Sequence, residues 1–178
     1  MSNTRHIYQI CSFVLKFLKD ILQEKKTEYI KLGPWGGAEG DDWSFKPRSS
    51  GVFKGIEIGH GVVIDSLVFI SEDENGQTQN SGRIGGGGGS VQKIQFSQGE
   101  FLTMISGTKT KFDETKVVGS LNFKTNMSMY GPYGQANGSP FSIPIRGAKI
   151  VGFFGRCDTL VNAIGIYVEP STTTTTST

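Results

Sequence analysis

The most informative part of the sequence is Ile150-Val-Gly-Phe-Phe-Gly-Arg-Cys-Asp-Thr-Leu-Val-Asn-Ala-Ile-Gly-Ile-Tyr-Val-Glu-Pro170. It contains two short apolar runs, Lys149–Phe154 and Ala163–Val168, with a more polar segment between them. In the second run the aliphatic residues fall at alternate positions, so they share one face, as in a half-buried β-strand. The stretch therefore predicts two strands near the C-terminal end of the chain.

Further strands are predicted upstream. Val62–Ile70 is largely apolar, and the Asn75-Gly76 pair that follows is a strong hairpin-turn signal. Phe101–Ile105 and Gly119–Thr125 are short β-type runs, and the second of them alternates cleanly. Glycine accounts for 25 of the 178 residues, about twice the typical share of ~7%. Many short strands, tight turns and no intervening helices indicate antiparallel all-β packing.

A repeat is visible in the glycine-rich loops. Leu32–Gly40 and Ile84–Ser90 both lead into β-type segments, and Gly152–Gly155 is interpreted as a third, related corner. The spacings are too irregular for a solenoid. We therefore expect a barrel or prism of about three similar sheet units, which closes edges that would otherwise aggregate.

The two ends of the chain differ from this β region, which we assign to residues 29–170. Residues 1–28 predict an amphipathic helix whose apolar positions recur at three- and four-residue steps: Ile7, Cys11, Val14, Leu18, Ile21 and Leu22. Such a helix docks on its own domain or a sister subunit, or else anchors the chain at a membrane surface or partner; five basic and three acidic residues support the membrane alternative only weakly. Residues 171–178 are Ser and Thr only, and we expect disorder there.

Charge and targeting signals narrow the classes of function. Outside residues 1–28 the basic and acidic residues balance, 13 against 13, which excludes an electrostatic footprint for nucleic acid and suits a neutral ligand. No apolar run approaches a membrane span. Gln9 and Lys16 interrupt the apolar stretch near the N-terminus, which argues against a signal peptide. We expect a cytosolic or nuclear protein with Cys11 and Cys157 as free thiols.

Catalytic and metal chemistry finds no support in the residue pattern. His6 and His60 are the only histidines, and His60 lies between two glycines, where we expect a solvated turn residue. No cluster has the spacing of a zinc site, and neither glycine run ends as a phosphate-binding loop does. No nucleophile is paired with a base. The sequence therefore predicts a protein that is not an enzyme and uses no cofactor or metal.

The quoted stretch resembles the signature of the jacalin-related lectins, in which Gly-Phe-Phe-Gly-Arg precedes a sugar-binding loop and an Ala-Ile-Gly-Ile-Tyr strand. Three further segments agree in the same order: Gly33-Pro-Trp-Gly-Gly37, Met129-Tyr-Gly-Pro-Tyr-Gly134 and Ser139-Pro-Phe-Ser-Ile-Pro-Ile145. The similarity runs from about Lys31 to Pro170. The mannose-binding, cytosolic branch of the family matches best.

The resemblance implies a β-prism of three antiparallel four-stranded Greek-key sheets with pseudo-threefold symmetry. It also implies a shallow sugar site at one end, built by a glycine-rich first loop and a Gly-x-x-x-Asp loop. Carried over, the first loop supplies Gly40, and the second is Asp158-Thr159-Leu160-Val161-Asn162. Thr159 and Leu160 would present backbone amides to the sugar. The sequence departs from the pattern at both ends of this loop, because Asp158 replaces the glycine and Asn162 replaces the aspartate; Glu39 also stands where a glycine is common.

These departures bear on affinity. Asn162 keeps an acceptor oxygen but loses the charge, and a charged hydrogen bond contributes about 1.5–3 kcal/mol against ~1 for a neutral one. A loss of ~1.4 kcal/mol weakens binding tenfold. If position 158 needs a positive φ, Asp tolerates it better than most residues. Three outcomes stay open: a weakened or lost site, a new carboxylate supplied by Asp158, or sugar binding by other means.

A second sugar site occurs in some members of the family. Here Gly86–Gly89 is the candidate glycine loop, and Asp65-Ser-Leu-Val68 is the candidate facing segment. That segment ends in valine where an acid is expected. The sequence alone therefore does not favour a second site.

Two functions follow from these observations. The first is a non-catalytic lectin for mannose- or glucose-type glycans, forming a homo-oligomer so that weak sites of about millimolar affinity, ~−4 kcal/mol each, act together. The alternative is a degenerate lectin fold that serves protein interaction in defence or stress responses. Asp158, Asn162 and the N-terminal segment favour the alternative.

Overall fold

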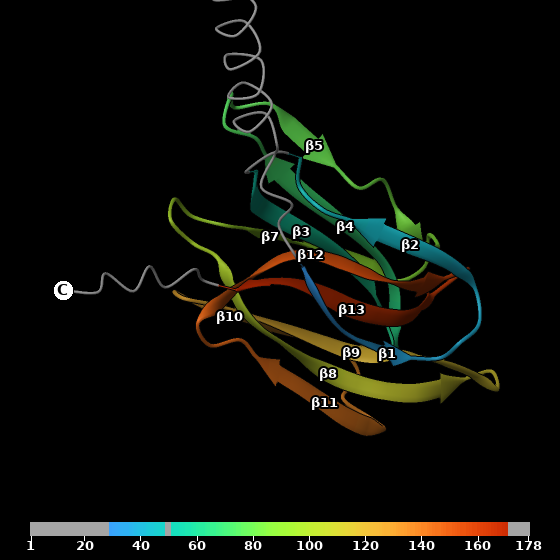
Figure 1. The fold of residues 1–178 in the computed structure, drawn as a ribbon. Coiled ribbons are helices and arrows are strands. Elements are labelled where there is room, and N and C mark those ends of the chain that lie inside the picture. Colours follow the sequence, from blue (N-terminus) through green and yellow to red (C-terminus); the bar gives the residue numbers. More distant parts are fainter. Residues whose placement is uncertain (1–28, 49–50, 171–178) are drawn as a thin grey trace, which may run out of the picture.

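The computed structural model describes residues 29–48 and 51–170, and these residues form three antiparallel β-sheets around a common interior (Figure 1). The first sheet has the order β1 (Ile30–Gly36), β13 (Val161–Pro170), β12 (Ala148–Cys157), β2 (Asp41–Phe45). The second has the order β5 (Thr78–Asn80), β4 (Ile64–Glu72), β3 (Val52–His60), β7 (Ser90–Gln95), with β6 (Ile84–Gly85) also on β4. The third has the order β10 (Met129–Gly134), β9 (Thr115–Thr125), β8 (Leu102–Phe112), β11 (Ser139–Pro144).

Each sheet is a Greek key with a central hairpin. In the third sheet, β8 and β9 form the hairpin, β10 returns to pair with β9, and β11 pairs with β8. The second sheet repeats this pattern, except that its outer position on β4 is shared by the two short strands β5 and β6. The first sheet closes the prism, because β1 and β2 from the start of the β region flank β12 and β13 from its end. The prediction of a three-sheet prism is confirmed.

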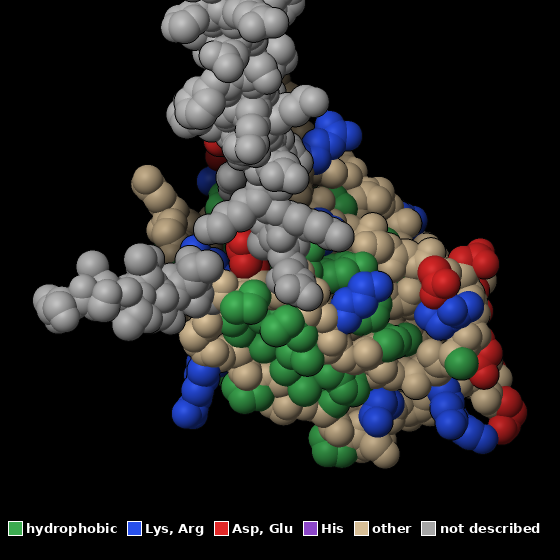
Figure 2. Space-filling model, viewed as in Figure 1, with side chains coloured by type: hydrophobic (Ala, Val, Ile, Leu, Met, Phe, Trp, Pro, Cys, Tyr) green, Lys and Arg blue, Asp and Glu red, His purple; other side chains and the backbone are tan. Residues whose placement is uncertain are grey.

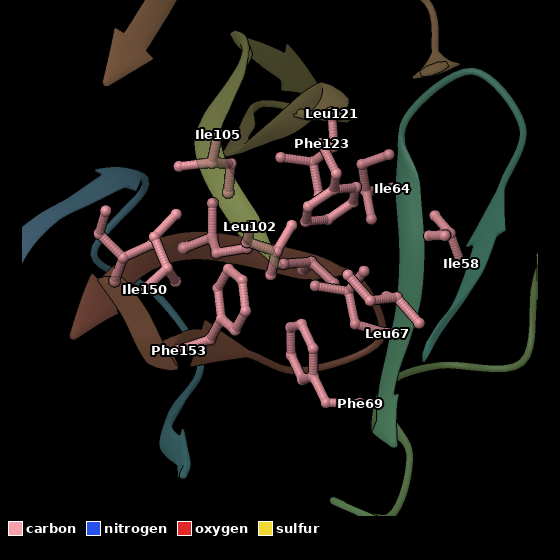
Figure 3. Close-up of a cluster of buried hydrophobic side chains, with 14 of the residues drawn as sticks. Ile58, Ile64, Leu67, Phe69, Leu102, Ile105, Leu121, Phe123, Ile150 and Phe153 are labelled. Atoms are coloured by element: carbon pink, nitrogen blue, oxygen red, sulfur yellow. The ribbon is translucent and has the colours of Figure 1, made fainter. Parts of the chain in front are cut away.

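The core contains one isoleucine–phenylalanine pair from each sheet. Phe153 lies opposite Ile166 in the first sheet, and the other two pairs are Ile56 with Phe69 and Ile105 with Phe123. All six side chains are fully buried. Figure 3 shows side chains from the three sheets converging here, and the Phe69 and Phe153 rings stack with centroids 4.3 Å apart. Removing one such ring should cost about 3–5 kcal/mol.

The strand boundaries differ from the sequence predictions in one instructive place. Gly152–Gly155, interpreted above as a corner, lies inside β12, so that interpretation was wrong. Gly155 is needed there for close packing, since a Cβ atom at this position would overlap the Ala163 carbonyl on the neighbouring strand. The third corner is instead the loop of residues 135–138, between β10 and β11.

The outer face of the first sheet carries aromatic side chains beside lysines, and Figure 2 shows an apolar group with adjacent basic side chains on the side facing the viewer. Phe154 and Tyr167 pack with ring centroids 5.0 Å apart, and Lys31 Nζ lies 5.1 Å from the Phe154 ring. No helix in the described part of the chain is long and apolar enough to cross a membrane. The predictions for residues 1–28, including Cys11, and for residues 171–178 lie outside the described residues.

Candidate functional sites at one end of the prism

Three pairs of loops lie at the same end of the prism, one pair for each sheet. Each pair combines the turn of the central hairpin with the loop that joins the two outer strands. We call residues 158–160 with 37–40 the first corner, residues 61–63 with 86–89 the second, and residues 113–114 with 135–138 the third.

The strand registers make these corners directly comparable. The last pair before the hairpin turn is Cys157 with Val161 in the first sheet and His60 with Ile64 in the second. A bulge precedes this pair in both sheets, and the third sheet has the same irregularity at Lys109 opposite Val118. The residues that follow Val161, Ile64 and Val118 are therefore equivalent, and these residues are Asn162, Asp65 and Gly119.

A glycine in the outer loop closes each corner against the hairpin. Gly40 and Gly89 both have positive φ values, 82° and 68°. A Cβ atom on Gly40 would lie 2.5 Å from the Cys157 carbonyl oxygen, and one on Gly89 would lie 2.5 Å from the His60 carbonyl oxygen. Both positions therefore require glycine, for backbone conformation and for space. In the third corner Gly138, with φ of 101°, packs in the same way against Lys109.

The third corner lacks the polar side chain that the other two have. Its equivalent residue is Gly119, which offers no side-chain acceptor at the position of Asp65. The hairpin turn here is instead formed by Asp113 and Glu114, both with positive φ. The third corner is therefore not a candidate site.

The first corner brings the predicted residues together. The Gly37 amide donates to the Asn162 carbonyl at 2.8 Å, and Gly40 lies against Asn162 Oδ1. This oxygen accepts from the Asp158 amide at 3.0 Å. The Asn162 side chain is 0% exposed, and its Nδ2 is a buried donor for which no acceptor lies among the described residues. The Asn162 side-chain oxygen, which was expected to bind a sugar hydroxyl, is thus buried beneath the loops.

Asp158 is committed to its own turn. Its Oδ1 accepts from the Leu160 amide at 3.1 Å and from the Thr159 hydroxyl at 3.4 Å. The Leu160 amide, one of the two amides predicted to face a sugar, is therefore already used. Position 158 is not among the residues with positive φ, so the replacement of glycine causes no backbone strain.

Arg156 and Glu39 close the first corner further. The Arg156 guanidinium pairs with Asp42 Oδ1 at 2.7 Å and donates to the carbonyls of Gly40 and Glu39. The Glu39 carboxylate bends back to accept from the Ala38 amide at 3.0 Å. In the second corner, Gly59 stands at the position of Arg156 and Gly88 at the position of Glu39. The second corner therefore lacks the hydrogen bonds that these two side chains make in the first. Side-chain hydrogen bonds thus hold the two loops of the first corner together, whereas the loops of the second corner have no such bonds from these positions.

The second corner carries the complete loop pattern. Gly61-Val62-Val63-Ile64-Asp65 has glycine and aspartate at the spacing that Asp158–Asn162 has lost. The two turns are the same, because Gly61 donates to the Val63 carbonyl at 3.1 Å as Asp158 donates to that of Leu160. The expectation that Asp65–Val68 is the segment facing the glycine loop was therefore wrong. The facing loop is Gly61–Asp65, and Asp65 is its last residue, not its first. The Gly-x-x-x-Asp spacing was readable in the sequence and was missed.

The Asp65 carboxylate lies over a loop of four glycines. The Gly86 amide donates to the Asp65 carbonyl at 3.0 Å, which fixes the loop on the strand. Cβ atoms on Gly88 and Gly89 would overlap the two carboxylate oxygens, so the backbone reaches the carboxylate only because these residues are glycine. Gly87, Gly88 and Gly89 are exposed, Asp65 is half-buried, and no described group hydrogen-bonds to the carboxylate. A charged acceptor and exposed glycines therefore lie together, and Asp65 and Gly86–Gly88 line the same groove.

His60 supports the second corner from below. It ends β3, half-buried, and its Nδ1 accepts from the Gly134 amide at 3.2 Å. Next to this bond, the Gln135 amide donates to the Val62 carbonyl at 3.0 Å. The expectation of a solvated turn residue was wrong, because the loop after β10 packs over the histidine. The hairpin of the second corner is thereby held by the third sheet.

A shallow groove of about 390 Å³ connects the two polar corners. Its walls are the glycine loop 86–88 with Asp65, the turn 158–160, and the β8–β9 hairpin around Asp113. Gly86 makes this contact close, because a Cβ atom there would overlap the Thr159 carbonyl. Among the described residues, no three His, Cys, Asp or Glu side chains gather in a way that could hold a metal ion.

A three-sheet prism with polar loop corners at one end defines a class of sugar-binding domains, and comparison with known proteins gives the same class. The family model described as Jacalin-like lectin domain matches residues 32–167. The chain is 42% identical over 146 residues to an agglutinin from Castanea crenata, covering 80% of this chain and 47% of that protein. It is 34% identical over 143 residues to horcolin from Hordeum vulgare, covering 79% and 97%. The chain thus spans about half of the first relative and nearly all of the second.

The solved structures agree. A mannose binding jacalin related lectin from Ananas comosus superposes with a TM-score of 0.73 at 40% identity, covering 80% of this chain and 98% of that one. The chain belongs to the jacalin-related lectin family. The family and these relatives are lectins, that is, carbohydrate-binding proteins.

Proposed function

We propose that this chain is a non-catalytic lectin for mannose- or glucose-type glycans and that its working site is the second corner. The observation that carries the proposal is the complete Gly61–Asp65 loop, whose half-buried carboxylate lies unpaired within the described part of the chain, beside the exposed glycines Gly87 and Gly88. The mannose binding of the similar lectin from Ananas comosus supports the choice of sugar.

The chemistry of the corner suits a hexose. Adjacent sugar hydroxyls each donate and accept, so a carboxylate that only accepts and amides that only donate can engage two neighbouring hydroxyls at once. Gly61 has no side chain, so the turn of the second corner has no counterpart of the Asp158 carboxylate that occupies the Leu160 amide. One shallow site of this size should bind at about millimolar strength, ~−4 kcal/mol.

The direct test is a titration of the full chain with methyl α-mannoside, followed by amide chemical shifts in NMR. Shifts should appear at Gly61, Val63 and Gly87–Gly89 and should saturate at millimolar sugar, while methyl α-galactoside serves as the control. A response confined to Gly40 and residues 158–162 would place the site in the first corner instead. No response to either sugar would contradict the lectin function.

The alternative, a degenerate lectin fold used for protein interaction, is not favoured. It was based on the Asp158 and Asn162 departures and on the N-terminal segment. The two departures affect one corner and leave the other complete, and residues 1–28 lie outside the described residues. A single weak site per chain gains useful avidity only when several chains act together. We therefore include a homo-oligomer and a cytosolic or nuclear location in the proposal, the first testable by light scattering and the second by imaging a tagged full chain.

A further inference from the structure

A second hollow lies at the opposite end of the prism. Its volume is about 600 Å³, and its walls come from the start of β3, the loop before β8 and the start of β12. β12 begins here at Ala148 and ends at Cys157 in the first corner, so the hollow and the sugar corners are a full strand apart. Nothing in the carbohydrate chemistry described above uses it.

Exposed apolar side chains gather around this hollow. Tyr29, Val52 and Phe101 line it and are 39%, 57% and 45% exposed. Met127, 56% exposed, lies next to it, with its Cε atom 3.9 Å from a Cβ atom built on Gly99. These four are half of the large apolar side chains that are exposed in the described residues. Such clustering marks a surface that something covers.

The chain itself leads to the hollow. Tyr29 lines it and is the residue that directly follows residues 1–28. The apolar positions of that segment, from Ile7 to Leu22, recur at helical spacing and would extend about 24 Å as a helix. The six residues from Gln23 to Glu28 can span up to roughly 20 Å, which lets the apolar face fold back over Tyr29. A short tether also gives the segment an effective concentration of about millimolar at this surface.

The charges around the hollow allow this docking. Lys46, Lys54 and Lys149 stand on the rim of the hollow, and Lys54 already pairs with Glu72 at 3.4 Å. The rim has two carboxylates, and that of Glu100 is turned inward and accepts three hydrogen bonds. The part of the segment nearest to Tyr29, residues 20–28, carries three acids, Asp20, Glu24 and Glu28, and two lysines, Lys25 and Lys26. Glu24 and Glu28 belong to the six residues that lead away from Tyr29, so their carboxylates can reach Lys46 and Lys149 on the rim.

We propose that residues 1–28 dock in cis on this hollow, with the apolar face of the segment on Tyr29, Val52 and Phe101. The lectin domain would then have two functional ends, a sugar end and an end that carries its own N-terminal segment. The occupant is this chain's own segment, and a second copy or a membrane are the rivals that the experiment must separate.

The experiment uses the full chain with one nitroxide label on the polar side of the segment, at Lys19→Cys in a Cys11→Ser, Cys157→Ser background. Paramagnetic broadening should remove most of the amide signal at Gly99, Phe101 and Ile150 and leave Gly61 and Gly87 unchanged. Val52→Lys should restore the signals. Val91→Lys is the matched control, since Val91 is 54% exposed in the same sheet but does not line the hollow. On the segment side, Leu18→Lys should restore the signals, whereas Gln23→Lys should not.

Two further arms distinguish the rivals. When ¹⁵N-labelled chain without nitroxide is mixed with an excess of unlabelled chain that carries it, the amides of Gly99, Phe101 and Ile150 should be broadened far less than in the chain with its own label, whether or not the chains form a homo-oligomer. Equal broadening of these amides in both samples would assign the segment to a second copy and overturn docking in cis. Vesicles of phosphatidylcholine and phosphatidylserine should leave the broadening intact. Loss of the broadening on these vesicles, or its absence without vesicles in the labelled chain that has no further substitution, would also overturn the proposal.

Discussion

Asn162 and Asp65 occupy the same position in two different sheets. Each is the second residue of its strand, and each carbonyl accepts from the first amide of the facing outer loop, Gly37 at 2.8 Å and Gly86 at 3.0 Å. Their side chains have the same shape, but Asn162 has an NH2 group where Asp65 has a second carboxylate oxygen. Asn162 is fully buried and bonded to its own turn, whereas Asp65 is half-buried beside bare glycines. The prism therefore contains a closed and an open version of one site, which makes internal comparison possible.

Asp65→Asn should weaken binding of methyl α-mannoside by about tenfold or more. The substitution keeps the shape and removes the charge, and the difference between a charged and a neutral hydrogen bond is about 1 kcal/mol or more per bond. NMR titration measures the change. Asp113→Asn is the control, since Asp113 borders the groove but not the second corner, and it should bind as the wild type does. Equal affinities for wild type and Asp65→Asn would remove Asp65 from the site.

Gly88→Ala should abolish binding without unfolding the domain. A methyl group at this position would overlap Asp65 Oδ1 and so displace the carboxylate, while φ at Gly88 lies outside the left-handed region. Gly76→Ala, in the exposed turn at the other end of β4, is the control: no heavy atom lies within 4 Å of a Cβ atom there, and the positive φ of 77° makes it the more strained variant. Sugar titration and thermal melting of both variants check the prediction. If Gly88→Ala bound the sugar as the wild type does, or if Gly76→Ala also lost binding, displacement of the carboxylate would not be the cause.

The first corner should regain binding when its loop pattern is restored. Asp158→Gly frees the Leu160 amide, and Asn162→Asp returns the charged acceptor, so the double variant should bind two sugars per chain. Glycan-dependent shifts should then appear at Gly40 and Thr159 in addition to those in the second corner. Asp158→Gly alone should add no site. If the double variant binds one sugar, the Arg156 and Glu39 fastenings are what keep this corner closed.

Local signals predicted the strands and turns, and the resemblance to the jacalin-related lectins implied their arrangement as a three-sheet prism. The alternating residues Gly119–Thr125 lie in β9, as predicted. The Asn75-Gly76 pair lies in the turn after β4, where Gly76 has a φ of 77°. The interpretation of Gly152–Gly155 as a corner was wrong because sequence alone does not distinguish a glycine that permits close strand packing from a glycine in a turn. Only the register opposite β13 separates the two.

The site was harder to predict than the fold. The resemblance pointed to Asp158–Asn162, and the structure does bring that loop to Gly40. Whether a loop is open depends on contacts that spacing does not encode, such as the hydrogen bond from Arg156 to the Gly40 carbonyl and the bond from Leu160 to Asp158. The Gly61–Asp65 pattern, by contrast, was present in the sequence, and the equivalence of the two hairpins gives it meaning.

Glu100 should make the stability of the domain depend on pH. Burial alone raises the pKa of this carboxyl, but hydrogen bonds from the Ser97 amide at 2.9 Å, the Thr125 hydroxyl at 2.7 Å and the Tyr130 hydroxyl at 2.8 Å outweigh it, and the pKa is lowered. A lowered pKa contributes stability above the unfolded carboxyl value of about 4.3, and this contribution is lost as the pH falls through the folded value.

Glu100→Gln should therefore destabilise the domain by about 1–3 kcal/mol at pH 7, because one of the two acceptor oxygens becomes an amide that faces the Ser97 donor. The gap between wild type and variant should narrow as the pH is lowered from about 5 toward 3. Urea unfolding at several pH values measures it. Glu74→Gln, in the exposed turn after β4, should show no such gap at any pH. A gap for Glu100→Gln that stayed constant down to pH 3 would mean that packing, and not the ionised carboxylate, holds the loop before β8 against β9.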